Sequence, residues 1–253
     1  MKKLVLTLVA VIAMTATTFA QNYGIAFGEM EVNGENAADI FGDGKASYSP
    51  EQNLLTLQEG FDYHLSKYFI TIATGRDFCI HLEGNAEIYA CIDCSDNLTI
   101  ESNEPDTLKI TANISGSALK CRNLTVNDNV TLDLLSRNSS SDFHALDCTA
   151  LTVSNAILTA EVTTARLAVA AETMTLDGCW LQKPRGGGIN PVEGGICFGD
   201  GIAAKQVRIT TVGYGIEEND EVMQNEKVQK RFEDGKIVII KDGKKYSITG
   251  QAL

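Results

Sequence analysis

Residues 118–126 read ALKCRNLTV, and variants of this stretch return along the chain. Residues 145–153 read ALDCTALTV, and residues 90–100 read ACIDCSDNLTI with two extra residues. Weaker copies are AVAAETMTL at 168–176 and GIAAKQVRI at 201–209. One apolar position steps along the copies by 27, 27, 23 and 33 residues, at Ile92, Leu119, Leu146, Val169 and Ile202. Repeats of this period are typical of solenoids.

The repeat predicts an all-β protein with a single-stranded parallel β-helix over residues 61–212. Apolar and polar residues alternate within each copy, which indicates two short strands separated by a bend. One such unit cannot bury its apolar side alone, whereas stacked units share a continuous core. The longest step holds a Gly-rich insertion, Arg185–Gly195. Solenoids tolerate insertions of this kind at the corner of a coil.

Three of the seven cysteines, Cys94, Cys121 and Cys148, occupy one position of the repeat, which Ala171 and Ala204 continue. Free cysteine packs as a small hydrophobic residue. We therefore predict a structural ladder of unpaired thiols at an inner corner. Strands about 4.8 Å apart also permit a disulfide between neighbouring coils, and that alternative stays open. Because the count is odd, at least one thiol is unpaired or buried.

The repeat has different sequences at its two ends. Residues 21–60 are expected to form an N-terminal cap and entry strands, because an open coil exposes apolar surface and strand edges. Residues 213–230 are acidic and polar and are expected to be a linker. Residues 231–253 predict a small β-hairpin, since Asp242-Gly243 separates two strand-like runs. A second pair, Asp234-Gly235, predicts a third strand there.

Residues 1–20 have the organisation of a secretory signal peptide. Lys2 and Lys3 precede the apolar run Leu4–Met14, and Thr18-Phe19-Ala20 forms a cleavage site. We expect an exported protein that is periplasmic, attached to the cell surface or extracellular. No later stretch is apolar over enough residues to span a membrane.

The formal net charge is −12. Nucleic acid and anionic lipid require a basic surface, so the composition argues against both as partners. The partner expected for an exported protein of this composition is a glycan or a protein at the cell surface.

Two stretches near the start, 32–40 and 46–57, resemble the opening of secreted bacterial β-helix proteins that are labelled carbohydrate-binding domain-containing proteins. The Leu-Thr-Ile/Val runs of the repeat fit the same group, and the resemblance covers about residues 25–210. The tail, Phe232–Leu253, is similar to a short C-terminal segment on many exported proteins of gut-type anaerobic bacteria. The resemblance implies sugar binding.

Two stretches superficially match catalytic motifs. His81-x-Glu83 followed by Cys91-x-x-Cys94 resembles a zinc deaminase signature, but it lacks the proline, and both cysteines fall at apolar positions of the repeat. The run 139–144 brings together Ser, Asp and His without the converging elements that a triad needs. We therefore predict no metal, no cofactor and no catalytic residue.

The candidate ligand-binding residues are Trp180, Lys183 and Arg185, beside and at the start of the Gly-rich insertion. An exposed Trp can stack on a sugar ring while the cations bind hydroxyl or carboxylate groups. The alternative is that Trp180, the only Trp in the chain, fills a widened coil.

The sequence predicts an exported, non-catalytic binding or surface protein that recognises carbohydrate on one flank of the β-helix. A first alternative is a polysaccharide lyase or hydrolase, for which Arg166, Arg185 and Arg208 offer cations. A second alternative is a structural or adhesive surface protein. Acids and bases converging in a cleft would favour an enzyme, an aromatic-lined groove would favour glycan binding, and a flat polar flank would favour the structural role.

Overall fold

The computed structural model describes residues 21–113, 116–138, 142–164 and 167–211, and the backbones of three strands between residues 228 and 247. The side chains of residues 65–68 and of those after residue 211 lie outside this description. The chain divides into two compact units, residues 1–212 and 213–253. The expected signal peptide and residues 213–227 of the expected linker lie outside the described residues. The described part of the chain holds no helical segment with the length and hydropathy that a bilayer span requires.

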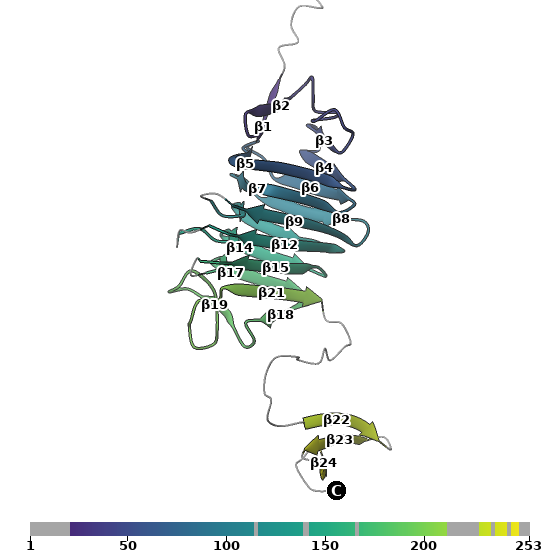
Figure 1. Ribbon diagram of the computed structural model, residues 1–253, viewed down its shortest axis with the longest axis vertical. Helices are drawn as coiled ribbons and strands as arrows, with labels where there is room; N and C mark the ends of the chain where they lie inside the picture. Colours follow the sequence, from purple (N-terminus) through teal and green to yellow (C-terminus); the bar gives the residue numbers. More distant parts are fainter. Residues whose placement is uncertain are drawn as a thin grey trace, which may run out of the picture. The chain divides into compact units, whose positions relative to one another are not determined.

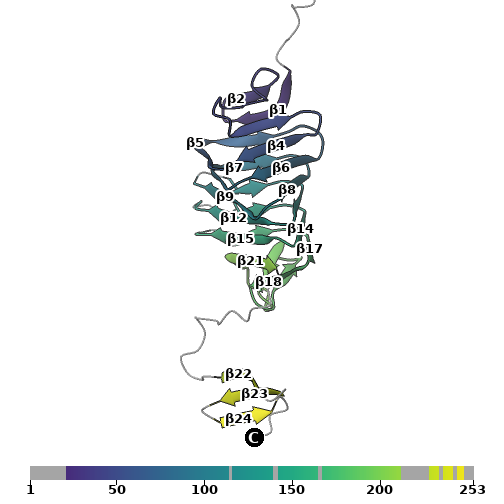
Figure 2. The ribbon, with the colours of Figure 1, turned by 90° about the vertical axis from the view of Figure 1, so that its right-hand side faces the viewer.

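The first unit is a parallel β-solenoid of about five turns, which confirms the predicted fold class. Its strands stack in layers along the molecule, as two perpendicular views show (Figures 1 and 2). A first row of parallel strands forms one sheet, which an antiparallel strand, β3 (Ala46–Ser49), extends at one edge. This row contains β4 (Leu54–Gln58), β6 (Phe78–Glu83), β8 (Leu98–Ser102), β11 (Asn123–Val126), β14 (Ala150–Ser154) and β17 (Thr173–Asp177).

A second and a third row belong to the other sheet of the solenoid. The second row contains β9 (Asp106–Ala112), β12 (Val130–Ser136) and β15 (Ile157–Val162), and the third contains β10 (Leu119–Lys120), β13 (Leu146–Asp147) and β16 (Val169–Ala170). Two longer strands, β5 (Phe61–Ile72) and β7 (Ala86–Cys94), run through both rows. A regular coil therefore has three strands, where the alternation predicted two, because a two-residue strand is too short to give a pattern.

The predicted register is confirmed for four of its five members. Ile92 pairs with Leu119, Leu119 with Leu146, and Leu146 with Val169, and all four side chains are buried. Placing Ile202 in this column was wrong, because this side chain is 63% exposed.

The last copy of the repeat forms an end cap instead of another parallel turn. Its strand β21 (Gln206–Thr211) runs antiparallel between β15 and β18 (Cys179–Lys183). The Gly-rich insertion forms a hairpin of β19 (Gly188–Asn190) and β20 (Gly195–Cys197), and β20 is antiparallel to β16. Alternation has the same period in either chain direction, so the pattern in the copy could not reveal the reversal.

The N-terminal residues cover the other end of the solenoid. Strands β1 (Asn22–Phe27) and β2 (Met30–Asn33) form an antiparallel pair, and β1 also pairs antiparallel with β5. The rings of Phe27, Phe41 and Tyr63 pack against one another with centroids 5.1–5.3 Å apart. The first solenoid strand is β4, which pairs in parallel with β6, so the coils begin near Leu54, before the expected boundary at residue 61.

The cysteine positions follow from the register. Cys94, Cys121 and Cys148 lie on successive turns, each is buried, and all seven cysteines are free. Ala171 continues this column, whereas Ala204 does not: its carbonyl accepts a hydrogen bond from the N–H of Ala168, 2.8 Å away, at a different position of the coil. Burial raises the pKa of the Cys94 thiol to about 11 and that of Cys148 to about 12.

The second unit contains a three-stranded antiparallel sheet of β22 (Val228–Glu233), β23 (Lys236–Lys241) and β24 (Lys244–Ser247). Asp242 and Gly243 lie between β23 and β24, as the hairpin prediction requires. The strand β22 begins three residues inside the segment that was expected to be linker.

The buried thiols predict a specific reactivity. Thiolates are the reactive form, and a pKa of about 11 in place of 9 lowers the thiolate fraction of Cys94 at pH 8 about 100-fold. Burial also blocks the approach of a reagent. We expect Cys94, Cys121 and Cys148 to resist a disulfide-exchange reagent in the native protein at pH 8, and seven thiols to react after denaturation without reductant. Fewer than seven would show that neighbouring coils are joined by a disulfide.

Candidate functional site

The corner between the second and third rows is where the coils differ most. In three successive coils the strands of these rows are joined by loops, at residues 113–118, 137–145 and 163–168, which we call the corner loops. Their described parts are tied together along the stack. The N–H of His144 donates to Ser117 Oγ at 3.1 Å, and Nδ1 of His144 lies 2.8 Å from the carbonyl oxygen of Leu167. His144 therefore acts as a link between loops.

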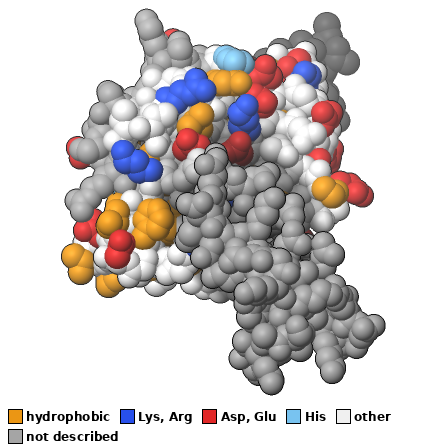
Figure 3. All heavy atoms as spheres, turned by 60° about the horizontal axis from the view of Figure 1, so that its bottom comes forward, with side chains coloured by type: hydrophobic (Ala, Val, Ile, Leu, Met, Phe, Trp, Pro, Cys, Tyr) orange, Lys and Arg blue, Asp and Glu red, His pale blue; other side chains and the backbone are white. Residues whose placement is uncertain are grey.

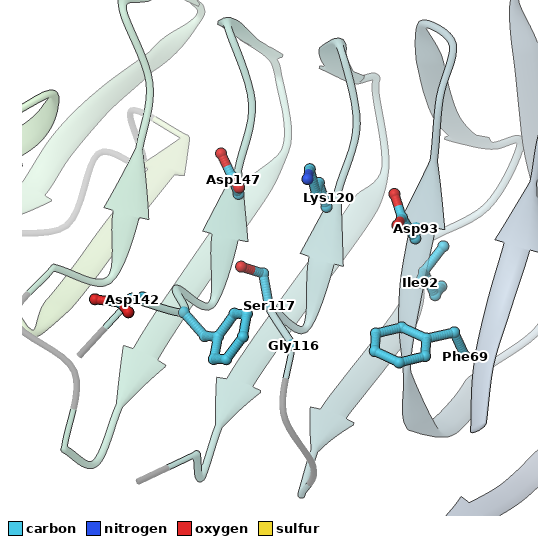
Figure 4. Close-up of a pocket in the computed structure, with 9 residues that line it drawn as sticks. Phe69, Ile92, Asp93, Gly116, Ser117, Lys120, Asp142 and Asp147 are labelled. Atoms are coloured by element: carbon cyan, nitrogen blue, oxygen red, sulfur yellow. The ribbon is translucent and has the colours of Figure 1, made fainter. Parts of the chain in front are cut away.

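A hollow of about 410 Å³ opens beside these loops, and we call it the corner hollow (Figure 4). Strands β5, β7, β10 and β13 supply one side of it, and two corner loops supply the other. Its lining consists of two aromatic, one aliphatic and several polar residues: Phe69, Ile92, Asp93, Gly116, Ser117, Lys120, Asp142, Phe143 and Asp147.

A column of alternating charge crosses the floor of the corner hollow. Asp93 pairs in register with Lys120, and Lys120 with Asp147. Each is the neighbour of a buried residue of the core column, so strand alternation turns it outward, and Figure 4 shows the three side chains pointing the same way. Neighbouring strands lie about 4.8 Å apart. The three ion pairs found within the described residues lie elsewhere, so the column presents its charges to the hollow.

Phe69 supplies exposed aromatic surface at one side of the corner hollow. Its side chain is 38% exposed, although it lies on a strand of the solenoid. Gly116 makes room for the ring: a Cβ at this position would lie 2.7 Å from Phe69 Cε1 and 2.8 Å from Cys91 Sγ. The absence of a side chain at residue 116 therefore sets where the Phe69 ring can lie.

The predicted ligand-binding residues lie outside the corner hollow, at the end of the solenoid. Trp180 and Lys183 are on the edge strand β18, and Arg185 is exposed in the segment that follows it. Trp180 is 45% exposed, so it does not fill a coil. Exposed hydrophobic side chains gather at one side of this end (Figure 3). The large exposed hydrophobic side chains in the segment from residue 179 to residue 211 are Trp180, Val192, Phe198 and Ile202.

The described residues contain no group of three His, Cys, Asp or Glu side chains that could hold a metal ion. Cys91 and Cys94 of the deaminase-like motif are buried in the core, and burial raises the pKa of both thiols to about 11. The buried position of both side chains leaves them in the apolar core of the solenoid, away from the solvent-facing residues of the motif. The serines at 139–141 and Arg166 lie outside the described residues.

Sequence reasoning did not identify the corner hollow. A signal was nevertheless present, because Asp93, Lys120 and Asp147 each precede the cysteine of their repeat and stand between two buried positions. A charged residue at the same outward position of three successive copies indicates a surface that runs across the coils. Phe69 and Phe143 give no comparable signal, since neither belongs to a quoted copy.

Comparison of the chain with protein families, with curated proteins and with solved structures found no match.

The space at Gly116 gives a prediction. In a Gly116→Ala variant the Phe69 ring and the Cys91 side chain must both move, and we expect a loss of about 1–2 kcal/mol in the free energy of unfolding. Gly188→Ala is the matched control, because nothing lies within 4 Å of the added carbon. Urea unfolding measures both. Equal effects of the two substitutions would contradict the packing described for Phe69.

Proposed function

We propose that the chain is an exported, non-catalytic protein that binds a glycan in the corner hollow. The observation that carries the proposal is that exposed aromatic surface, on Phe69, borders the same hollow as the column Asp93–Lys120–Asp147. The signal-like residues 1–20 and the resemblance to carbohydrate-binding β-helix proteins support the same reading.

The chemistry of the corner hollow suits a sugar. An aromatic ring can pack on the C–H face of a pyranose, and carboxylates accept hydrogen bonds from its hydroxyl groups, while an ammonium donates. A volume of about 410 Å³ lies in the range of sites for small molecules. Because the column alternates in charge across three coils, it offers acceptors and a donor at fixed spacing.

The charge of the hollow indicates which sugars fit. In the column two carboxylates, on Asp93 and Asp147, flank one ammonium, on Lys120. An anionic sugar would be repelled there. We therefore propose a neutral or amino sugar as the ligand of the corner hollow. The same excess of carboxylates disfavours a lyase, which must neutralise a uronate with cations.

A hydrolase is the second candidate, and one observation favours it. Asp93 and Asp147 stand two strand spacings apart, roughly 9–10 Å, near the upper end of the separation in inverting glycosidases. Against it, Lys120 lies between them, where such an enzyme holds its water.

Binding of glycans to the exported chain tests the proposal. We expect an array of neutral and amino-sugar oligosaccharides to contain ligands, and we expect Phe69→Ala and Asp147→Asn each to weaken binding about tenfold, since each removes a contact of roughly 1.4 kcal/mol. Phe198→Ala is the matched control, because Phe198 is an aromatic of similar exposure, 47%, outside the hollow.

Two outcomes would contradict the proposal. If no glycan binds, or if Phe198→Ala weakens binding as much as Phe69→Ala, the corner hollow is not a glycan site. Shortening of the bound oligosaccharide during incubation, lost in the Asp147→Asn variant, would instead establish the hydrolase.

A further inference from the structure

The end of the solenoid carries a second surface, which lies outside the corner hollow. Val207 and Ile209 of β21 are fully buried, so Arg208 and Thr210 between and beside them face outward. On the neighbouring edge strand, Trp180 lies opposite Thr210 and Lys183 lies opposite Arg208. We call these four residues, Trp180, Lys183, Arg208 and Thr210, the β18 surface.

A β-bulge brings Trp180 and Lys183 to the same side of the sheet. Residues three apart in a regular strand point to opposite faces. Here the register shifts between Leu181 and Lys183, so that one extra residue, Gln182, is inserted on β18. Trp180 and Lys183 therefore face the same way as Thr210 and Arg208. Bulges that redirect a side chain are common beside functional sites.

The pairing of Lys183 with Arg208 is unfavourable for the fold alone. Like charges directly opposite each other on neighbouring strands destabilise a sheet. Among the described residues, neither cation forms an ion pair. The acid on the adjoining strand, Glu161, accepts a hydrogen bond from Gln206 Nε2 at 3.0 Å. Two exposed cations thus stand side by side next to an exposed Trp, and within the described residues no ion pair offsets their charge.

We propose that the β18 surface binds an acidic sugar, with Lys183 and Arg208 holding its carboxylate or sulfate group and Trp180 stacking on its ring. A guanidinium binds planar or tetrahedral oxyanions through two parallel hydrogen bonds. Extended polyanions such as nucleic acid fit poorly, because only two cations are present and the chain carries a net charge of −12. The site has the opposite charge preference to the corner hollow, and it does not depend on binding there.

The chain itself supplies the probe for this site. Trp180 is the only tryptophan in the chain, so intrinsic tryptophan fluorescence reports on the β18 surface alone. The full exported chain is titrated with tetragalacturonate and with a chondroitin sulfate tetrasaccharide, and the methyl-esterified galacturonate tetramer serves as the uncharged counterpart. We expect a saturable fluorescence change with at least one acidic oligosaccharide and none with the methyl ester.

Variants separate the β18 surface from the corner hollow. Lys183→Gln and Arg208→Gln are each expected to weaken acidic-sugar binding about tenfold, and added salt should weaken it further. Lys120→Gln, which removes an exposed cation in the corner hollow, is expected to leave acidic-sugar binding unchanged. Equal loss in all three variants would overturn the assignment, as would a fluorescence change with the methyl ester or no change with either acidic probe.

The repulsion between Lys183 and Arg208 can be tested without a ligand. If Lys183 and Arg208 repel each other, replacing either by Gln relieves the repulsion, and we expect Tm to rise by roughly 1–2 °C at low salt. A fall in Tm in both variants would show that the pair stabilises the fold, and the reason for placing an anion there would be lost.

Discussion

The stacking of one buried residue from each coil on the next is the constraint on which the rest of the structure depends. The column Ile92–Leu119–Leu146–Val169 holds successive turns in register. A slip of one residue would turn the apolar side chains outward, so the core tolerates no other alignment. The same register places Lys120 between Asp93 and Asp147. The charged floor of the corner hollow is therefore a consequence of how the core packs, and its spacing is as fixed as the spacing of the strands.

The predictable part of the fold is the part that repeats. Copies such as 118–126 and 145–153 contain both the apolar column and the cysteine column, and these were read correctly from spacing alone. The third row was missed because β10, β13 and β16 have only two residues each. The reversal of β21 was missed for a different reason. Alternation of period two places Val207 and Ile209 inward whichever way the strand runs, and only its neighbours decide the direction.

The candidate sites were less predictable, because each depends on contacts between segments that no local pattern links. Trp180 and Lys183 share a face only through the bulge at Gln182, and Arg208 joins them from a strand that was expected to run the other way. The corner hollow combines a column that the repeat could have revealed with loops whose positions depend on one another. The links through His144 to Ser117 and Leu167 join three loops, and such links cannot be inferred from one loop at a time.

The two surfaces suit a polymer better than a single sugar. The corner hollow is proposed to accept neutral or amino sugars and the β18 surface acidic ones, and both belong to the same stacked body of residues 21–211. Strand stacking in a shared core holds the separation of the two surfaces constant. A glycan that is long enough to reach both therefore meets the second surface at a high effective concentration once it has bound the first. Two weak contacts then suffice for firm binding, and neither needs a deep pocket. A glycan that alternates acidic with neutral residues has the chemistry that both sites require, and it would bind far more tightly than its separate sugars.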